Sequence, residues 1–167
     1  MSVSSRPFKP GSHRLGLCTL ISPPSAAEAE TLGTLLAEME PWRTLGSTPA
    51  GLAAYLCRED PALRRYAVRV DQAVAGAVCV RWPWLRGPYL ELLGLAKDCQ
   101  GRGIGAEILA WVEAEARKSS SNLWVVASSF NRRALDFYRR QGFNDIGLLE
   151  SLVRPGYDEV LLRKRLD

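Results

Sequence analysis

A strand-to-helix turn built on three glycines constrains the fold of this chain more than any other feature. The glycines take alternate positions in the segment Gln100-Gly101-Arg102-Gly103-Ile104-Gly105. Residues 89–95 before the turn form an apolar run, which is typical of a buried strand. Residues 104–118 after it repeat apolar side chains at helical spacing, with most charged side chains on other faces. The sequence therefore predicts a strand, a tight turn and an amphipathic helix in succession.

The glycine turn has the chemistry of a diphosphate-binding site. Glycine lets the backbone curl tightly and come close to a ligand. The first N–H groups of a helix have no intrahelical partner, and the helix dipole adds positive potential at the same place. Arg102 adds a full positive charge beside them. The turn therefore suits a phosphate or a pyrophosphate.

Two common nucleotide-binding motifs do not fit this turn. A P-loop has Lys followed by Ser or Thr after its last glycine, where this chain has Ala106 and Glu107. A dinucleotide-binding turn tolerates Ala106 as its third small residue, but an acidic residue also ends its next strand. Residues 123–129, which form that strand here, contain no acid, and the unit begins in mid-chain without a repeat. Both interpretations fail on their context.

A third pattern, Gln100-x-x-Gly103-x-Gly105, resembles the acyl-CoA pyrophosphate loop of the GNAT superfamily of N-acyltransferases. The resemblance covers roughly residues 89–143, about a third of the chain. Its further marks, in order, are Leu95 five positions before Gln100, a second strand at 123–127, Asn131, a helix bearing Tyr138, and the pair Gly142-Phe143. Residues 131–143 are similar to the corresponding stretch of the ribosomal-protein alanine acetyltransferases.

The order of the remaining elements agrees with this resemblance. The expected elements are a strand over 14–21, a helix capped by Ser25 with Glu28 and ending before Pro41, a helix from Thr48-Pro49, strands over 66–70 and 74–82 with a hairpin turn at 71–72, the unit over 89–127, the helix bearing Tyr138, and strands over 145–153 and 157–163. Short links imply antiparallel pairs, and the strand–helix–strand unit implies one right-handed parallel crossover.

The predicted fold class is α/β, with a GNAT-like mixed sheet that is mostly antiparallel, has one parallel strand–helix–strand crossover, and carries helices on both faces. The resemblance further implies that the two crossover strands splay apart and admit the acyl-pantetheine arm. With 167 residues, we expect a single GNAT domain over residues 13–167, preceded by a flexible tail over residues 1–12.

The amino-acid composition indicates the compartment in which the protein works. A content of 47% hydrophobic and 24% charged residues is ordinary for a soluble protein. No apolar stretch reaches the length of a membrane span, and the first residues are too polar for a secretory signal. Four isolated cysteines suit a reducing compartment. A cytoplasmic protein without a membrane partner is therefore expected.

The charge pattern limits the classes of partner that the protein is expected to bind. A net charge of +4 assists an anionic cofactor, but no long basic run with interleaved aromatics points to nucleic acid. His13 is the single histidine, so the sequence offers no second histidine to complete a metal site with it. We therefore expect neither a nucleic-acid partner nor a metal, and the sequence leaves monomer and homodimer open.

The resemblance implies acetyl-CoA as co-substrate and a set of residues that bind it. By analogy with the GNAT family, a backbone N–H near Leu95 donates to the oxyanion. The same analogy places Arg102 at the pyrophosphate and Arg139 or Arg140 at the adenosine phosphate. The full cofactor-binding set is Leu93, Gly94, Leu95, Gln100, Gly101, Arg102, Gly103, Ile104, Gly105, Ala106, Asn131, Ala134, Phe137, Tyr138 and Arg140.

Tyr138 is the predicted general acid. Moving an acyl group from a thioester to an amine requires a neutral amine, a hydrogen-bond donor for the oxyanion and a proton for the thiolate. Asn131, Ala134 and Tyr138 share one helical stripe, and the resemblance assigns proton donation to the tyrosine. The alternative is a core tyrosine that packs beside Phe137.

Glu91 is the predicted general base. An acid within an apolar strand is costly to bury unpaired. By alternation it shares a strand face with Leu93 and Leu95, the side expected to look into the cleft. The alternatives are an edge residue or an ion pair with Arg81 or Arg86. Because Val126 stands where the alanine acetyltransferases have a glutamate, a water relay is the alternative to a side-chain base.

The acceptor site and the overall activity are the last inferences. In GNAT enzymes the acceptor enters over the loop between the first two helices and the loop between the last two strands. The candidates for binding a cationic amine there are Glu40, Trp42, Arg43 and Glu150. The expected function is an N-acetyltransferase that moves an acetyl group to a primary amine of a small molecule or a peptide terminus by direct attack. The alternative is a catalytically silent acyl-CoA-binding regulatory module, because Val126 stands where the alanine acetyltransferases have a glutamate.

Overall fold

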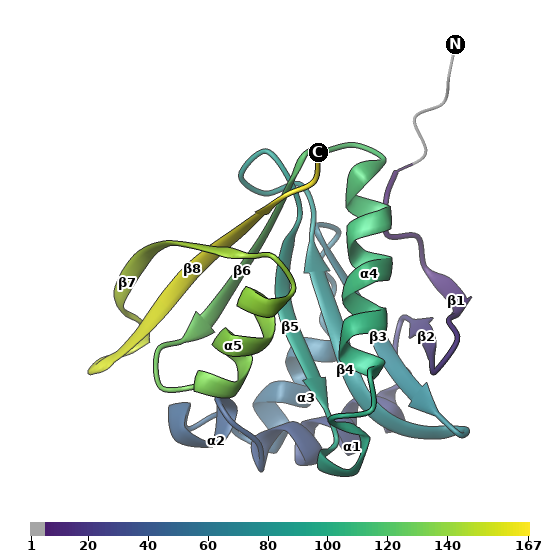
Figure 1. Cartoon of the computed structure of the whole chain (residues 1–167). Coiled ribbons are helices and arrows are strands. Elements are labelled where there is room, and N and C mark those ends of the chain that lie inside the picture. The colour runs from purple at the N-terminus through teal and green to yellow at the C-terminus, as the bar shows by residue number, and fades with distance from the viewer. Residues whose placement is uncertain (1–5) are drawn as a thin grey trace.

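A mixed sheet of eight strands forms the centre of the computed structural model, which describes residues 6–167 (Figure 1). The strands lie in the order β1-β2-β3-β4-β5-β6-β8-β7, and every neighbouring pair is antiparallel except β5 and β6. Their bounds are β1 (Gly11–Arg14), β2 (Thr19–Ser22), β3 (Leu63–Val70), β4 (Ala73–Arg81), β5 (Tyr89–Leu95), β6 (Asn122–Ser128), β7 (Asn144–Arg154) and β8 (Tyr157–Arg165).

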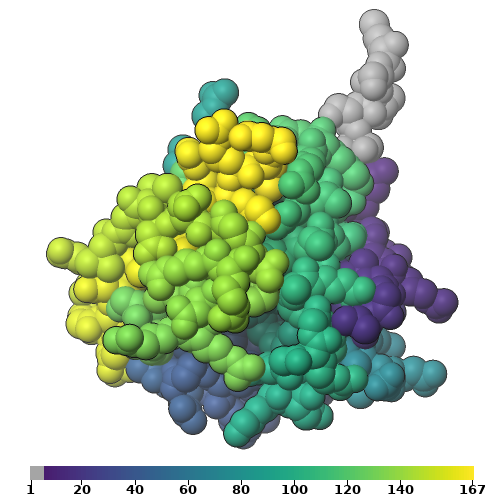
Figure 2. Space-filling model, in the orientation of Figure 1, coloured from purple at the N-terminus to yellow at the C-terminus, as the bar shows by residue number. Residues whose placement is uncertain are grey.

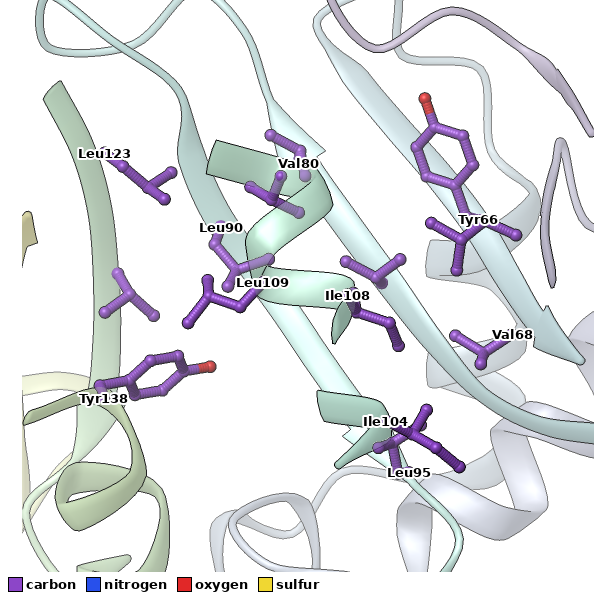
Figure 3. Close-up of a cluster of buried hydrophobic side chains, with 14 of the residues drawn as sticks. Tyr66, Val68, Val80, Leu90, Leu95, Ile104, Ile108, Leu109, Leu123 and Tyr138 are labelled. Carbon is purple, nitrogen blue, oxygen red and sulfur yellow. The ribbon is translucent and has the colours of Figure 1, made fainter. Parts of the chain in front are cut away.

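Helices cover both faces of this sheet. The α-helices of the described residues are α1 (Ala26–Ala37), α2 (Trp42–Leu45), α3 (Pro49–Cys57), α4 (Ile104–Arg117) and α5 (Arg132–Arg140). In Figure 1, α4 and α5 lie in front of the sheet, and α1 and α3 lie behind it. Each face has its own apolar layer, and Figure 3 shows Ile108 and Leu109 of α4 packed over Val80 and Leu90. The predicted fold class is confirmed.

The parallel pair β5 and β6 is joined only at its beginning. Tyr89 pairs with Trp124 and Leu90 with Val125, and no further pairs follow. Beyond them β5 stays on β4, while β6 continues to Ser128 on β8. The two strands therefore diverge toward their C-terminal ends, as Figure 1 shows. The splay that the resemblance implied is present.

The two helix starts predicted from caps are confirmed. Ser25 accepts a hydrogen bond from the N–H of Glu28 at 3.1 Å, and Thr48 accepts one from the N–H of Gly51 at 3.0 Å. The side chain of Glu28 does not close the capping box, because it pairs with Arg69 instead. The single turn α2 was not predicted, since four residues are too few for a periodic pattern.

The predicted first strand over 14–21 is wrong, because a tight turn divides it into β1 and β2. The N–H of Leu15 donates to the carbonyl of Cys18 at 2.8 Å. The carboxylate of Glu107, in the first turn of α4, accepts from the N–H groups of Gly16 at 2.7 Å and Leu17 at 2.9 Å. A distant side chain thus holds this turn, which local sequence does not reveal.

The predicted tail over residues 1–12 is also wrong from Phe8 onward. Phe8 is 1% exposed and meets the ring of Trp111 edge-on at 6.0 Å. Its N–H donates to the carboxylate of Glu115 at 3.0 Å, and β1 already begins at Gly11. One buried aromatic side chain is enough to fasten this segment to α4. Residues 1–5 lie outside the described residues.

Candidate active site

A cavity of about 370 Å³ opens where the glycine turn, the end of β5, α5 and the loop before α2 meet. Figure 2 shows the residues of α5 beside those of the glycine turn on the surface that faces the viewer. The cavity is lined by Met39, Glu40, Trp42, Leu93, Gly94, Leu95, Gln100, Gly101, Gly103, Gly105, Ala106, Asn131, Arg133, Ala134, Phe137, Tyr138, Arg140 and Gln141. Most residues predicted to bind the cofactor are therefore brought together in one place.

The glycine turn has the backbone of an anion cradle. Gly101 and Gly103 have φ values of +73° and +82°, a left-handed conformation that favours glycine. Gly103 is the N-cap of α4, and no side chain caps its N–H groups. The amide of Gln100 donates to the carbonyl of Leu95 at 2.8 Å and ties the turn to the end of β5. The uncapped N–H groups are available to an anionic ligand.

Two residues of the predicted cofactor set are not placed in this cavity. Ile104 is 1% exposed and points into the apolar core, because it is the first residue of the buried face of α4. Arg102 has an exposed side chain that does not line the cavity. Arg133 and Arg140, seven positions apart on α5, bring cationic side chains to it instead.

Sequence reasoning missed Arg133, Met39 and Gln141 as cavity residues. The signal for Arg133 was present, because Arg133, Phe137 and Arg140 recur at helical spacing on one stripe. Met39 gave no local signal, since it lies in the loop before α2 and reaches the cavity only through the tertiary fold.

The end of β5 turns free backbone donors toward the gap between the strands. The N–H of Ala96 donates to the carbonyl of Ala75 on the β4 side at 2.7 Å. Because alternate N–H groups of a strand point to opposite sides, those of Leu93 and Leu95 point toward β6. The divergence of β6 leaves them without a strand partner. This geometry supports the expected oxyanion donor near Leu95.

Tyr138 lies in the wall of the cavity with Asn131 and Ala134, as the shared stripe predicted. Its ring packs against Phe137 and Phe143, with centroid distances of 5.2 and 5.5 Å. Figure 3 shows its hydroxyl pointing away from α5 and toward β5. Burial raises the pKa of Tyr138 above its ordinary value, so the phenol keeps its proton at neutral pH.

The prediction that Glu91 shares a face with Leu93 and Leu95 is wrong. The register between β4 and β5 passes from Val80 opposite Leu90 to Cys79 opposite Leu92, so that Glu91 is the extra residue of a β-bulge. Leu90 belongs to the apolar layer under α4, whereas Leu92 belongs to the layer under α1 and α3. The bulge thus turns Glu91 toward α3 and away from the cavity.

Glu91 is fully engaged on that side of the sheet. Arg81 donates to its Oε1 through Nε at 2.8 Å and to its Oε2 through Nη2 at 3.3 Å, and the hydroxyl of Tyr55 donates to Oε2 at 2.6 Å. Arg81 also pairs with Asp60 at 3.0 Å. Of the alternatives left open by the sequence, the ion pair with Arg81 is the one formed. Proton uptake by Glu91 would break that ion pair, and the assignment of this residue as the base is corrected.

We expect Glu91→Gln to lower stability rather than turnover. The substitution removes the charge that holds Arg81, and a hydrogen bond to a charged group is worth about 1.5–3 kcal/mol. The free energy of unfolding in urea should fall by that order, while turnover per folded molecule stays near that of the parent. A loss of turnover without a loss of stability would restore Glu91 as the base.

The predicted acceptor residues are only partly brought to the cavity. Glu40 and Trp42 line it, whereas Arg43 points outward and pairs with Glu40 at 2.7 Å. Hydrogen bonds from Thr44 and then Arg43 lower the pKa of Glu40, which keeps it anionic at neutral pH. Glu150 is exposed on β7 and does not line the cavity, because the edge strand carries it away.

The mixed sheet with one splayed parallel pair is the GNAT fold. The chain belongs to the acetyltransferase (GNAT) family, whose sequence pattern matches residues 30–143. Among curated proteins, the chain is 28% identical to an uncharacterized N-acetyltransferase of Methanocaldococcus jannaschii. The match extends over 102 residues, which are 60% of this chain and 65% of the relative. It is 37% identical to an acetyltransferase of Agrobacterium fabrum over 82 residues, and this match covers 49% of this chain and 56% of that relative.

The chain thus spans less than two thirds of the length of each of these curated relatives. Among solved structures, it resembles the Microcin C7 self immunity acetyltransferase, which was solved in complex with acetyl-CoA and AMP. That likeness has a TM-score of 0.74, covers 95% of this chain and 98% of the other, and shows the fold at 16% identity.

Within residues 6–167, no helix has the length and apolar character needed to cross a membrane.

Proposed function

We propose that this protein transfers an acetyl group from acetyl-CoA to a primary amine by direct attack of the amine on the thioester. One observation carries the proposal: a single cavity is lined both by the uncapped glycine turn and by Tyr138, beside the gap between β5 and β6. A ligand with a diphosphate at one end and a thioester at the other matches these two parts of the lining. Membership of the acetyltransferase family supports the same ligand.

The chain offers suitable groups to each part of acetyl-CoA. The N–H groups of Gly101, Gly103 and Gly105 hold the pyrophosphate, and Arg133 and Arg140 add positive charge. The N–H groups of Leu93 and Leu95 face the pantetheine arm and the carbonyl oxygen that becomes negative. Such fixed donors stabilise a developing oxyanion because they need no reorientation during the reaction.

Acetyl-CoA itself supplies an activated acyl group, so no covalent nucleophile of the chain is required. Tyr138 stands beside the cavity as the proton donor for the thiolate that leaves. Its hydroxyl makes no hydrogen bond to any described residue and is not fully buried, which leaves its proton free for this purpose. The ring is fixed by its aromatic neighbours, which holds the hydroxyl in one direction.

The acceptor proposed is a cationic primary amine of a small molecule or a peptide terminus. Glu40 is anionic at the cavity wall and attracts such an amine, and Trp42 offers a ring for cation–π contact. The similarity of residues 131–143 to the ribosomal-protein alanine acetyltransferases makes an N-terminal alanine one candidate. Four free cysteines support a cytoplasmic location.

The experiment is thiol release from acetyl-CoA in the presence of single amines, namely spermidine, glucosamine, lysine and a short peptide with an N-terminal alanine. At least one amine should release thiol and gain an acetyl group in equal amount. Tight binding of acetyl-CoA without thiol release for a wide range of amines would contradict transfer. That result would favour the silent acyl-CoA-binding module, for which the valine at position 126 is the sequence argument.

A further inference from the structure

A second acidic side chain, Glu159 of β8, is buried near the splayed strands. It is 4% exposed, and the hydroxyl of Ser128 donates to its Oε1 at 2.8 Å. Within residues 6–167 no lysine, arginine or histidine forms an ion pair with it. Its Oε2 has no hydrogen bond there, yet it is not sealed from solvent. An unpaired buried carboxylate is costly, which disfavours its charged form.

The strand register places Glu159 at the open part of the sheet. Glu159 pairs with Ser128 at the end of β6, three residues beyond the last pair that joins β6 to β5. Val125 and Ala127 of β6 lie in the apolar layer under α4 and α5. By alternation, Ser128 and Glu159 therefore point to the opposite face of the sheet.

That opposite face is also the one on which Trp42 packs, a cavity residue proposed to bind the acceptor, although Glu159 itself does not line the cavity. Figure 1 shows α2 at the end of the sheet where β6 finishes and β8 begins. A Cβ at Gly94 would meet the ring of Trp42 at 2.9 Å, so the start of α2 covers the end of β5 on this face. Arg154, at the end of β7, donates to the carbonyl of Thr44 at 2.8 Å and fixes this side of the opening. Tyr138 stands on α5, across the sheet from Glu159.

The surroundings of Glu159 favour proton uptake. Burial raises the pKa of Glu159, and nearby Asp158 raises it further, while the hydrogen bond from Ser128 opposes the shift. On β7 it faces Leu149, which carries no charge. From β5, Tyr89 lies near both Glu91 and Glu159; burial and these two carboxylates raise its pKa to about 12. Glu159 thus differs from Glu91, whose two oxygens are bound by Arg81 and Tyr55.

We propose that Glu159, oriented by Ser128, is the general base that takes a proton from the acceptor ammonium; this inference rests on the proposed acetyl transfer. An oxygen of the carboxylate forms an O–H bond as one N–H bond of the ammonium breaks, and the electron pair stays on nitrogen. The neutral amine then forms the C–N bond to the acetyl carbon, the C–S bond breaks, and the thiolate takes the proton of Tyr138. A second N–H bond of the acylated nitrogen breaks, and its proton returns to the phenolate of Tyr138, which leaves a neutral amide. The excess proton, held by Glu159, returns to water.

The test compares Glu159→Gln with the parent in thiol release, using the amine of the panel that the parent acetylates fastest, with Glu91→Gln as the matched control. Glutamine keeps the size of the side chain and the hydrogen bond from Ser128. At pH 7 kcat/KM should fall by about a hundred-fold or more, the usual effect of losing a general base. The affinity for acetyl-CoA should be unchanged, and Glu91→Gln should keep its turnover.

The pH dependence separates a base from a structural residue. An alkylamine with a pKa near ~10.4 becomes neutral at high pH. The deficit of Glu159→Gln should therefore shrink about tenfold with each pH unit and vanish near pH 10. A deficit that stays the same at every pH, or a variant with parental activity at pH 7, would overturn the assignment. A pH-dependent deficit in Glu91→Gln would also overturn it.

Ser128→Ala keeps the proposal falsifiable even where Glu159→Gln does not fold. This change removes the hydrogen bond that opposes the rise in the pKa of Glu159. The base must be deprotonated to act, so the acidic limb of the pH–rate profile should move to higher pH. An unmoved limb would overturn the role of Glu159 in an active enzyme. A parent that releases no thiol with any amine would instead reject the acetyl transfer itself.

Discussion

Replacing Tyr138 by phenylalanine should lower turnover by about a hundred- to ten-thousand-fold, which is the range of general-acid catalysis. Phenylalanine keeps the ring that packs between Phe137 and Phe143 and removes only the hydroxyl. Because this hydroxyl makes no hydrogen bond to any described residue, its loss leaves no unsatisfied partner in the protein. The melting temperature and the affinity for acetyl-CoA should therefore stay near those of the parent.

Steady-state kinetics with the best amine of the panel measures this effect. The Michaelis constant of the acceptor should move little, which is the pattern of an interaction made mainly in the transition state. Burial raises the pKa of Tyr138, so the parent should lose activity through this group only above its ordinary pKa near ~10, and the variant should lack this decline. Full turnover in Tyr138→Phe would leave the tyrosine as a packing residue.

Gly103→Val should weaken acetyl-CoA binding strongly. Valine is strained at a φ of +82° and shifts the N–H groups at the start of α4 away from the diphosphate. Hydrogen bonds to charged groups are worth about 1.5–3 kcal/mol each, so the loss of two corresponds to roughly a hundred- to ten-thousand-fold in Kd. Calorimetric titration with acetyl-CoA gives the affinity, and urea unfolding gives the stability of the same sample.

Gly156→Val is the matched control for this strain. Gly156 has a φ of +84° in the turn between β7 and β8, and a Cβ there would touch nothing within 4 Å. The same backbone penalty should therefore appear in its stability, while its acetyl-CoA affinity remains parental. Parental affinity in folded Gly103→Val, or an equal loss of affinity in both variants, would contradict the cradle.

Local patterns in the sequence predicted the parts of the site that single segments build. The glycine turn needs only a strand, three glycines and a helix start in succession. The stripe of Asn131, Ala134 and Tyr138 needs only the period of one helix. Both depend on residues close together in the chain, and both line the cavity as expected.

Interactions between distant segments decided the parts that sequence reasoning missed. Glu91 was misplaced because a bulge, set by the register of β5 against β4, shifts the alternation by one residue. Glu159 gave no signal, since its hydrogen-bond partner, Ser128, lies 31 positions away on β6. The tight turn before β2 likewise depends on Glu107, about 90 positions further on. In each case the local sequence predicted a strand or a turn, but it did not predict the distant residue that contacts it.

The central claim is that one cavity binds the diphosphate and the thioester of acetyl-CoA at its two ends. A crystal structure of the protein with coenzyme A tests this claim most directly. We expect the pyrophosphate within hydrogen-bond distance of the N–H groups of Gly101, Gly103 and Gly105, and the sulfur beside the hydroxyl of Tyr138 between β5 and β6. Coenzyme A bound elsewhere, or bound at the glycine turn with its thiol directed away from Tyr138, would contradict the account.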